Sequence, residues 1–158
     1  MVLLLVSVAG ARIRPGGHDD MLVSTKWLSE HLPDNDLVLV QIGPQESEYA
    51  EGHIPNARFL QTEKISDVRD GVKHELLRTD ELIANLEALG IGNDSRVVIY
   101  ASHYPTVATR LYWTLDYLGI AKNASLLDGG IDQWKAEHRP LSTDLSVAPK
   151  PGKIKARV

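Results

Sequence analysis

Two short apolar runs, each preceded by a helical pattern, constrain the fold of this chain more than any other feature. Residues 37–42 form a nearly continuous run rich in β-branched side chains, and residues 97–100 form a second. Such runs are typical of strands buried on both faces of a parallel sheet. Strands that alternate with helices pair in parallel through right-handed crossovers. We therefore expect an α/β fold with an open parallel sheet and helices on both faces.

Three of the four helical patterns have a favourable first residue and a glycine or proline at the end. Residues 44–78 show no clear period, and we expect loops with short pieces of structure there. A third strand is expected at residues 124–127. The expected helices begin at Ser24 or Thr25 and end before Pro33, begin at Thr79 and end at Gly90, begin near Pro105 and end at Gly119, and follow Gly129–Gly130 to include Trp134.

The two ends of the chain differ in character from the expected domain at residues 21–140. We expect residues 1–20 to be a leader, a signal remnant or a misassigned start, because the apolar segment 1–11 ends in small residues, as a secretory signal does. No Lys or Arg precedes that segment, and it is too short to span a bilayer. Residues 141–158, rich in Pro and Lys, are expected to be a linker or tail. We expect a cytoplasmic protein, or a periplasmic or secreted one if residues 1–11 are a signal remnant.

Charge and cysteine content exclude several classes of function. The formal net charge of −4 gives no overall basic field for phosphate backbones, so we expect no nucleic-acid partner. The sequence contains no cysteine, which excludes disulfides, thiolate metal sites and thiol nucleophiles. Its 6 histidines show no metal-ligand spacing, and we expect neither a metal nor a cofactor.

The loop at residues 101–106 is the first place to look for a site. Sites in open parallel sheets form at the carboxyl ends of strands, and this loop joins a buried strand to the clearest helix. Backbone amides at a helix start can cradle an anion. Group transfer would need a nucleophile at the floor of that cradle, where Ala101 has no reactive atom. The candidate anion- or partner-binding residues are Ser102, His103, Tyr104, Thr106 and Arg110.

Several separated motifs resemble the rhodanese family, in the family's own order, across about residues 22–143. Residues 48–57 are similar to its Glu-Tyr and Gly-His-Ile-Pro-Gly-Ala signature, and residues 127–130 to its Leu-Asp-Gly-Gly. Between them, residues 97–115 resemble its strand, active-site loop and following helix. The resemblance implies a rhodanese-like open parallel sheet. The motif residues are Glu48, Tyr49, Gly52, His53, Pro55, Asp128, Gly129, Gly130 and Trp134.

The resemblance is closest to the N-terminal, non-catalytic half of two-domain thiosulfate or 3-mercaptopyruvate sulfurtransferases. It rests on residues 23–28 and on the linker after Pro140. The family's reactive cysteine lies in the C-terminal half. Catalytic members often place Asp and Arg where this chain has Gln41 and Gly43, and Cys where it has Ala101. The resemblance thus implies an inactive domain whose partner is a catalytic rhodanese domain, or which self-associates.

Other interpretations of the same residues stay open at this point. A free-standing inactive module could bind an anion or a protein partner through the 101–106 loop. A serine hydrolase would need Ser102 activated by His103, but no acid is assigned to orient that His. Turn formation explains His53 and Asp128 at least as well as catalysis does, and backbone angles explain the two glycines at 129–130. For Arg110, the family's use of this helix position suggests packing or an ion pair rather than a ligand contact.

Overall fold

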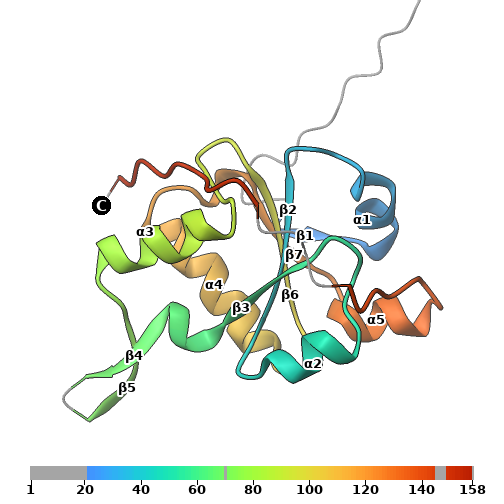
Figure 1. Cartoon of the computed structure of the whole chain (residues 1–158), viewed down its shortest axis with the longest axis horizontal. Coiled ribbons are helices and arrows are strands. Elements are labelled where there is room, and N and C mark those ends of the chain that lie inside the picture. The colour runs from blue at the N-terminus through green and yellow to red at the C-terminus, as the bar shows by residue number, and fades with distance from the viewer. Residues whose placement is uncertain (1–20, 70, 145–148, 158) are drawn as a thin grey trace, which may run out of the picture.

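A parallel five-stranded sheet separates two layers of helices in the computed structural model, which describes residues 21–69, 71–144 and 149–157 (Figure 1). The strand order is β1-β7-β6-β2-β3. The strands are β1 (Leu22–Val23), β2 (Leu37–Gly43), β3 (Arg58–Gln61), β6 (Arg96–Ala101) and β7 (Ala124–Leu127), with a separate antiparallel hairpin of β4 (Ser66–Arg69) and β5 (Val72–Leu76). The helices are α1 (Thr25–His31), α2 (Glu46–Glu51), α3 (Thr79–Ala88), α4 (Pro105–Tyr117) and α5 (Gly130–Ala136), with short 3₁₀ helices η2 (Thr62–Lys64) and η3 (Ala121–Asn123).

The central strands are buried on both faces because their side chains alternate between two apolar layers. In β2, Val38 and Val40 pack into the cluster shared with α3 and α4, whereas Leu39 packs into the one shared with α1, α2 and α5. In β6, Ile99 packs into the cluster shared with α3 and α4, and Val98 packs into the one shared with α1, α2 and α5. The expected α/β class, with a parallel sheet and helices on both faces, is therefore confirmed.

The capping residue before α1 and the glycines after α3 and α4 were predicted correctly from the sequence. The hydroxyl of Ser24 caps α1 by accepting a bond from the Trp27 N–H at 3.1 Å. Gly90 and Gly119 follow α3 and α4 with φ of 77° and 73°, angles that suit glycine at a helix end. β3 was not foreseen as a strand of the main sheet. It is a short edge strand with only Phe59 and Leu60 as apolar residues, too few for a periodic pattern to develop in it.

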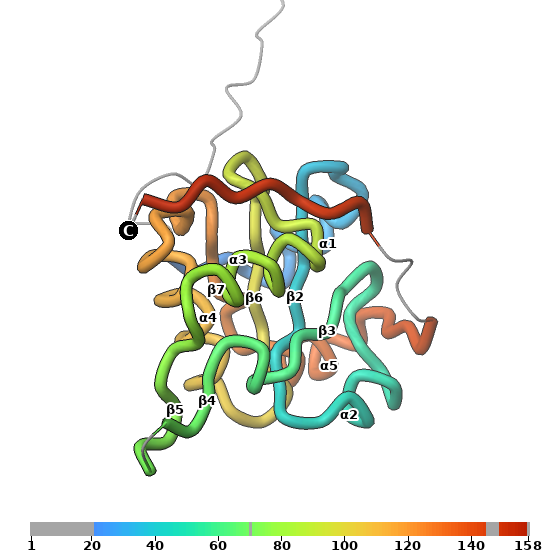
Figure 2. Tube along the Cα trace, turned by 60° about the vertical axis from the view of Figure 1, so that its left-hand side comes forward, coloured from blue at the N-terminus to red at the C-terminus, as the bar shows by residue number. Residues whose placement is uncertain are grey.

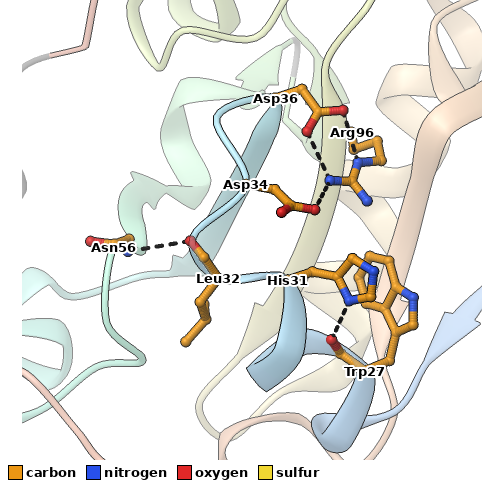
Figure 3. Close-up of polar contacts among 7 residues, drawn as sticks. All are labelled: Trp27, His31, Leu32, Asp34, Asp36, Asn56 and Arg96. Atoms are coloured by element: carbon orange, nitrogen blue, oxygen red, sulfur yellow. Dashed lines mark hydrogen bonds and ion pairs between the residues drawn. The ribbon is translucent and has the colours of Figure 1, made fainter.

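A charged cluster fastens the start of the sheet to α1 (Figure 3). The Arg96 guanidinium donates to Asp36 at 2.8 and 3.0 Å and to Asp34 at 2.5 Å. It also lies 5.7 Å from the ring centre of Trp27, against which His31 stacks. The bonds to Asp36, ahead of those to Asp34, raise the pKa of Arg96. The turn before β2, the start of β6 and α1 are thereby joined.

On the same side of the sheet, the Thr25 hydroxyl joins α1 to the end of α5 by donating to Glu137 at 2.6 Å. Hydrogen bonds from Gln133 first, and then from Thr25 and Arg139, lower the pKa of Glu137 to about 2. The carboxylate therefore stays ionised across the range in which most proteins are handled.

The described part of the tail, residues 149–157, lies against the domain at the end of the sheet where β2 and β6 begin (Figure 2). Ile154 and Ala156 pack against the cluster shared with α3 and α4. Hydrogen bonds between the tail and the domain run from Gly152 N–H to Glu87 O, Ile154 N–H to Glu87 Oε1, Asn93 N–H to Lys153 O, Lys155 N–H to Asn93 Oδ1 and Arg157 N–H to Leu118 O.

No helix within residues 21–69, 71–144 and 149–157 is long and apolar enough to cross a membrane.

We expect Gly152→Ala to detach the tail and to destabilise the domain. A Cβ at this position would lie 1.9 Å from the carbonyl oxygen of Ile91, a backbone atom that cannot rotate away. Such crowding costs on the order of 1–3 kcal/mol. Thermal unfolding should show a midpoint several degrees lower, and the Gly152 amide should lose its protection from hydrogen exchange. The exposed neighbour Pro151 gives the control, since Pro151→Ala should leave both unchanged.

Candidate functional site

A pocket lies where β6 and β7 end. The chain leaves β6 into α4 on one face of the sheet and leaves β7 into α5 on the other, so the two loops diverge (Figure 1). The pocket between them is called the crevice. The pocket has a volume of about 400 Å³. Its lining comes from residues 99–103, 105, 108–109, 126–130 and 132, together with Leu22 of the edge strand.

Ala101 is the last residue of β6 and forms part of the pocket wall. The turn at Gly129–Gly130 packs closely against it, because a Cβ at Gly130 would lie only 3.3 Å from the Ala101 carbonyl oxygen. Both glycines have positive φ, 70° and 57°. At Gly129 a Cβ would also lie 2.4 Å from the Cβ of Gln133. The double glycine is thus required by backbone angle and by space.

A chain of hydrogen bonds runs beneath the 101–106 loop. The buried Gln41 donates from Nε2 to the Ser102 hydroxyl at 2.9 Å and accepts from the Tyr100 hydroxyl at 2.9 Å. The Tyr100 oxygen in turn accepts the Ile54 N–H at 3.1 Å. Burial raises the pKa of Tyr100 well above its ordinary value of 10.0. This neutral network fixes Ser102 relative to β2 and to the 48–57 motif.

The remaining loop residues diverge from one another. The His103 imidazole lies 3.4 Å from a carboxylate oxygen of Glu48, and both groups are partly exposed. Tyr104 is 61% exposed, and Thr106 is exposed in the first turn of α4. No hydrogen bond joins Ser102 to His103 in the described part of the chain. The geometry therefore lacks the serine–histidine contact that a hydrolase would need.

Arg110 faces the β4–β5 hairpin. Its guanidinium donates to the backbone carbonyl of His74, and its buried Nε has no partner among the described residues. Neither Arg110 nor any other arginine or lysine lines the pocket. The carboxylate residues Asp128 and Asp132 do line it. The crevice is consequently mostly apolar, with two acidic residues in its lining and no lysine or arginine.

The motif at residues 48–57 forms a rigid support for the site. Tyr49 donates to the carbonyl of Ala57 at 2.7 Å and stacks on the buried His53, with ring centres 3.7 Å apart. His53 Nδ1 bonds the Tyr49 carbonyl at 2.8 Å. The backbone of His53 pairs with Ser142 in both directions. Gly52 and Pro55 lie in the connection between α2 and β3 that these contacts fix.

Trp134 of α5, the last residue of the family motifs, is fully buried, and its Nε1 donates to the Pro140 carbonyl at 2.8 Å.

No group of three or more His, Asp or Glu side chains suited to a metal ion occurs in the described ranges. Sequence reasoning missed the roles of Gln41, Tyr100 and Asp132. Only Gln41 carried a signal, because it is the one polar residue within an apolar strand pattern and therefore needed hydrogen-bond partners.

Comparison with known proteins adds independent findings. A model of the rhodanese-like domain family matches residues 24–137. The chain is 34% identical over 136 residues to a sulfur carrier protein, TtuD, of Thermus thermophilus, covering 86% of this chain and 46% of that protein. It is 32% identical over 130 residues to a putative thiosulfate sulfurtransferase of Mycobacterium leprae, covering 82% and 46% respectively. The chain thus spans about half the length of these relatives.

Solved structures agree with the fold. The crystal structure of SseA from Escherichia coli, described with the rhodanese fold and catalytic mechanism of 3-mercaptopyruvate sulfotransferases, superposes with a TM-score of 0.76. Sequence identity to it is 27%, and the match covers 87% of this chain and 55% of that one. The 3-mercaptopyruvate sulfurtransferase of Leishmania major shares the fold with a TM-score of 0.75 at 21% identity.

We expect Tyr100→Phe to destabilise the domain at neutral pH by about 1–3 kcal/mol, because the buried Ile54 N–H loses its acceptor. The difference in free energy of unfolding between the natural chain and Tyr100→Phe should become smaller above pH 10. The folded-state pKa of Tyr100 is raised, so the unfolded chain loses this proton first and the natural chain loses stability as pH rises. Urea unfolding of both chains at pH 7 and at about pH 10.5 measures this.

The exposed Tyr104 provides the matched control, since Tyr104→Phe should change stability little at either pH. A constant difference between Tyr100→Phe and the natural chain across the two pH values would contradict a shifted titration at this hydroxyl.

Proposed function

The chain belongs to the rhodanese-like domain family, and we propose that it serves as the non-catalytic half of a longer sulfurtransferase. In this role it packs against a catalytic rhodanese domain and forms one wall of the cleft between them. The 101–106 loop and the crevice beside it are the surface that faces this partner.

The observation that carries the proposal is the residue at the end of β6. A sulfur-transfer loop needs a thiolate there, held by amides and cations that lower its pKa. This chain has Ala101 at the position, and no cysteine at any of its 158 positions. Any persulfide must therefore be carried by another chain or domain.

The lengths of the relatives support a two-part arrangement. The matched region accounts for 46% of the Thermus protein and 46% of the Mycobacterium protein, leaving room in each for a second domain of similar size. By the family resemblance, such a domain takes sulfur from thiosulfate or a related donor onto a cysteine. It then passes the sulfur to cyanide or another thiophile, while this half shapes the cleft.

The network beneath the loop also suits a structural role. Gln41 and Gly43 end β2 without any charge, and the hydrogen bonds of Gln41 are directed to Tyr100 and Ser102. A neutral amide makes these bonds without a counter-charge, so the loop is held in position by residues that carry no reactive group.

A free-standing inactive module is the second candidate, and the retained 400 Å³ pocket is the observation that favours it. The size of the expressed polypeptide distinguishes the two candidate functions. An antibody against residues 21–144 should detect, in extracts of the source cells, a polypeptide roughly twice the size of this chain if it is half of a two-domain protein. A band at the size of this chain alone would favour the module.

We expect the purified chain to release no thiocyanate from thiosulfate and cyanide above the rate without protein. The chain offers no atom that can hold the transferred sulfur. Activity of the natural chain would overturn the proposal. Ala101→Cys tests what the crevice retains, and Ser102→Cys is the matched control that places a thiol one residue further along.

Incubation with thiosulfate, followed by mass spectrometry, reports the gain of one sulfur atom. We expect neither variant to turn over at an appreciable rate, because the lining supplies two carboxylates and no cation to support a thiolate. Persulfide on the Ala101→Cys variant but not on the Ser102→Cys variant would show that only the nucleophile has been lost.

A further inference from the structure

We propose that the crevice between the ends of β6 and β7 binds an organic cation, an ammonium or guanidinium group carried on an apolar stem. The proposal stands on the pocket of this chain alone and goes beyond the proposed function, because it does not require the catalytic partner. It also gives the pocket a ligand of opposite charge to the anions that rhodanese chemistry handles.

The walls of the crevice suit an apolar stem. Its lining is mostly aliphatic, and its volume of about 400 Å³ lies within the usual range for small-ligand sites, roughly 300–1,000 Å³. Leu22 is 59% exposed at the edge of the sheet, so the pocket stays open on that side. The aliphatic walls are formed by Leu22, Ile99, Ala108, Leu126 and Leu127.

The charge of the lining selects a cation. Asp128 and Asp132, both exposed, belong to the lining of the same crevice, and neither carboxylate forms an ion pair or side-chain hydrogen bond with a described residue. The imidazole of His103, also in the lining, lies beside a third carboxylate, Glu48. An ammonium group at the mouth of the pocket would therefore meet two carboxylates with no competing lysine or arginine in the lining.

The features that would hold an anion are weak here. The first residue of α4 is Pro105, which has no N–H to donate. In the same first turn the Val107 N–H is already used, because it donates to the carbonyl of Tyr104 at 3.0 Å. Arg110, the nearest arginine on the helix, is bonded to His74 in the hairpin. The helix start thus contributes little to offset the two carboxylates.

A titration of the intact ¹⁵N-labelled chain followed by NMR tests the proposal, with pentylammonium as the probe and pentanoate and 1-pentanol as matched probes. We expect saturable shifts of the amides of residues 101–103 and 128–132 with pentylammonium. Pentanoate should bind at least about tenfold more weakly, and 1-pentanol should fall between them.

The double variant Asp128→Asn/Asp132→Asn should weaken pentylammonium binding about tenfold. The matched control is Asp94→Asn/Asp116→Asn, which removes the same charge from exposed positions outside the crevice and should bind as the natural chain does. Pentanoate binding as tightly as pentylammonium, or equal binding by both double variants, would overturn the proposal.

The two carboxylates also flank the amino end of α5, where negative charge suits the helix dipole. If they serve the helix alone, Asp128→Asn/Asp132→Asn will lower the melting temperature without changing pentylammonium affinity, and this result too would overturn the proposal. Cation binding is measured without any catalytic domain, so failure to bind pentylammonium does not contradict the proposed sulfurtransferase role. Activity of the natural chain in the thiocyanate assay would contradict that role but not the proposed cation site.

The cation can come from a free amine or from a lysine side chain of a protein. Nα-acetyl-lysine-N-methylamide carries the same stem with the backbone amides of a peptide chain. Affinity equal to or above that of pentylammonium identifies a protein side chain as the source, whereas markedly weaker binding identifies a free amine.

Discussion

Burial of β2 and β6 on both faces is the constraint on which the rest of the structure depends. Each of these strands must present apolar side chains alternately to two layers, so helices have to cover both sides of the sheet. Because α4 covers one face and α5 the other, the loops that lead into them part at the ends of β6 and β7. The crevice follows from this division, before any residue in it is considered.

Gln41 is a polar residue that interrupts the apolar pattern of β2. An amide buried at the end of a central strand is tolerated only with its hydrogen bonds made. Its bonds to Tyr100 and Ser102 join β2, β6 and the 101–106 loop, and Tyr100 extends the chain to Ile54. The 48–57 motif and the loop, about fifty residues apart in sequence, thereby share one network.

Sequence reasoning predicted the parts governed by local rules. The capped start of α1 at Ser24 and the glycine after α3 at position 90 are determined by residues close in the chain, and both were located correctly. β3 was missed because its pairing with β2 is non-local and because the strand is too short, with Arg58 and Gln61 at its ends, to show a pattern. The direction of Arg110 depends on the hairpin carbonyl at His74, which no motif encodes. The pocket lining likewise joins Leu22 to residues a hundred positions away.

The charge of the crevice and the absence of cysteine are physically consistent with each other. A thiolate at the end of β6 needs positive charge or several free amides nearby, and carboxylates beside it raise the thiol pKa and suppress the reactive form. Here Asp128 and Asp132 lie in the lining, Pro105 removes one amide, and Arg110 is bonded elsewhere. With Ala101 in that place there is no thiolate for these carboxylates to destabilise. The same two carboxylates are the groups that we propose attract an organic cation to the crevice.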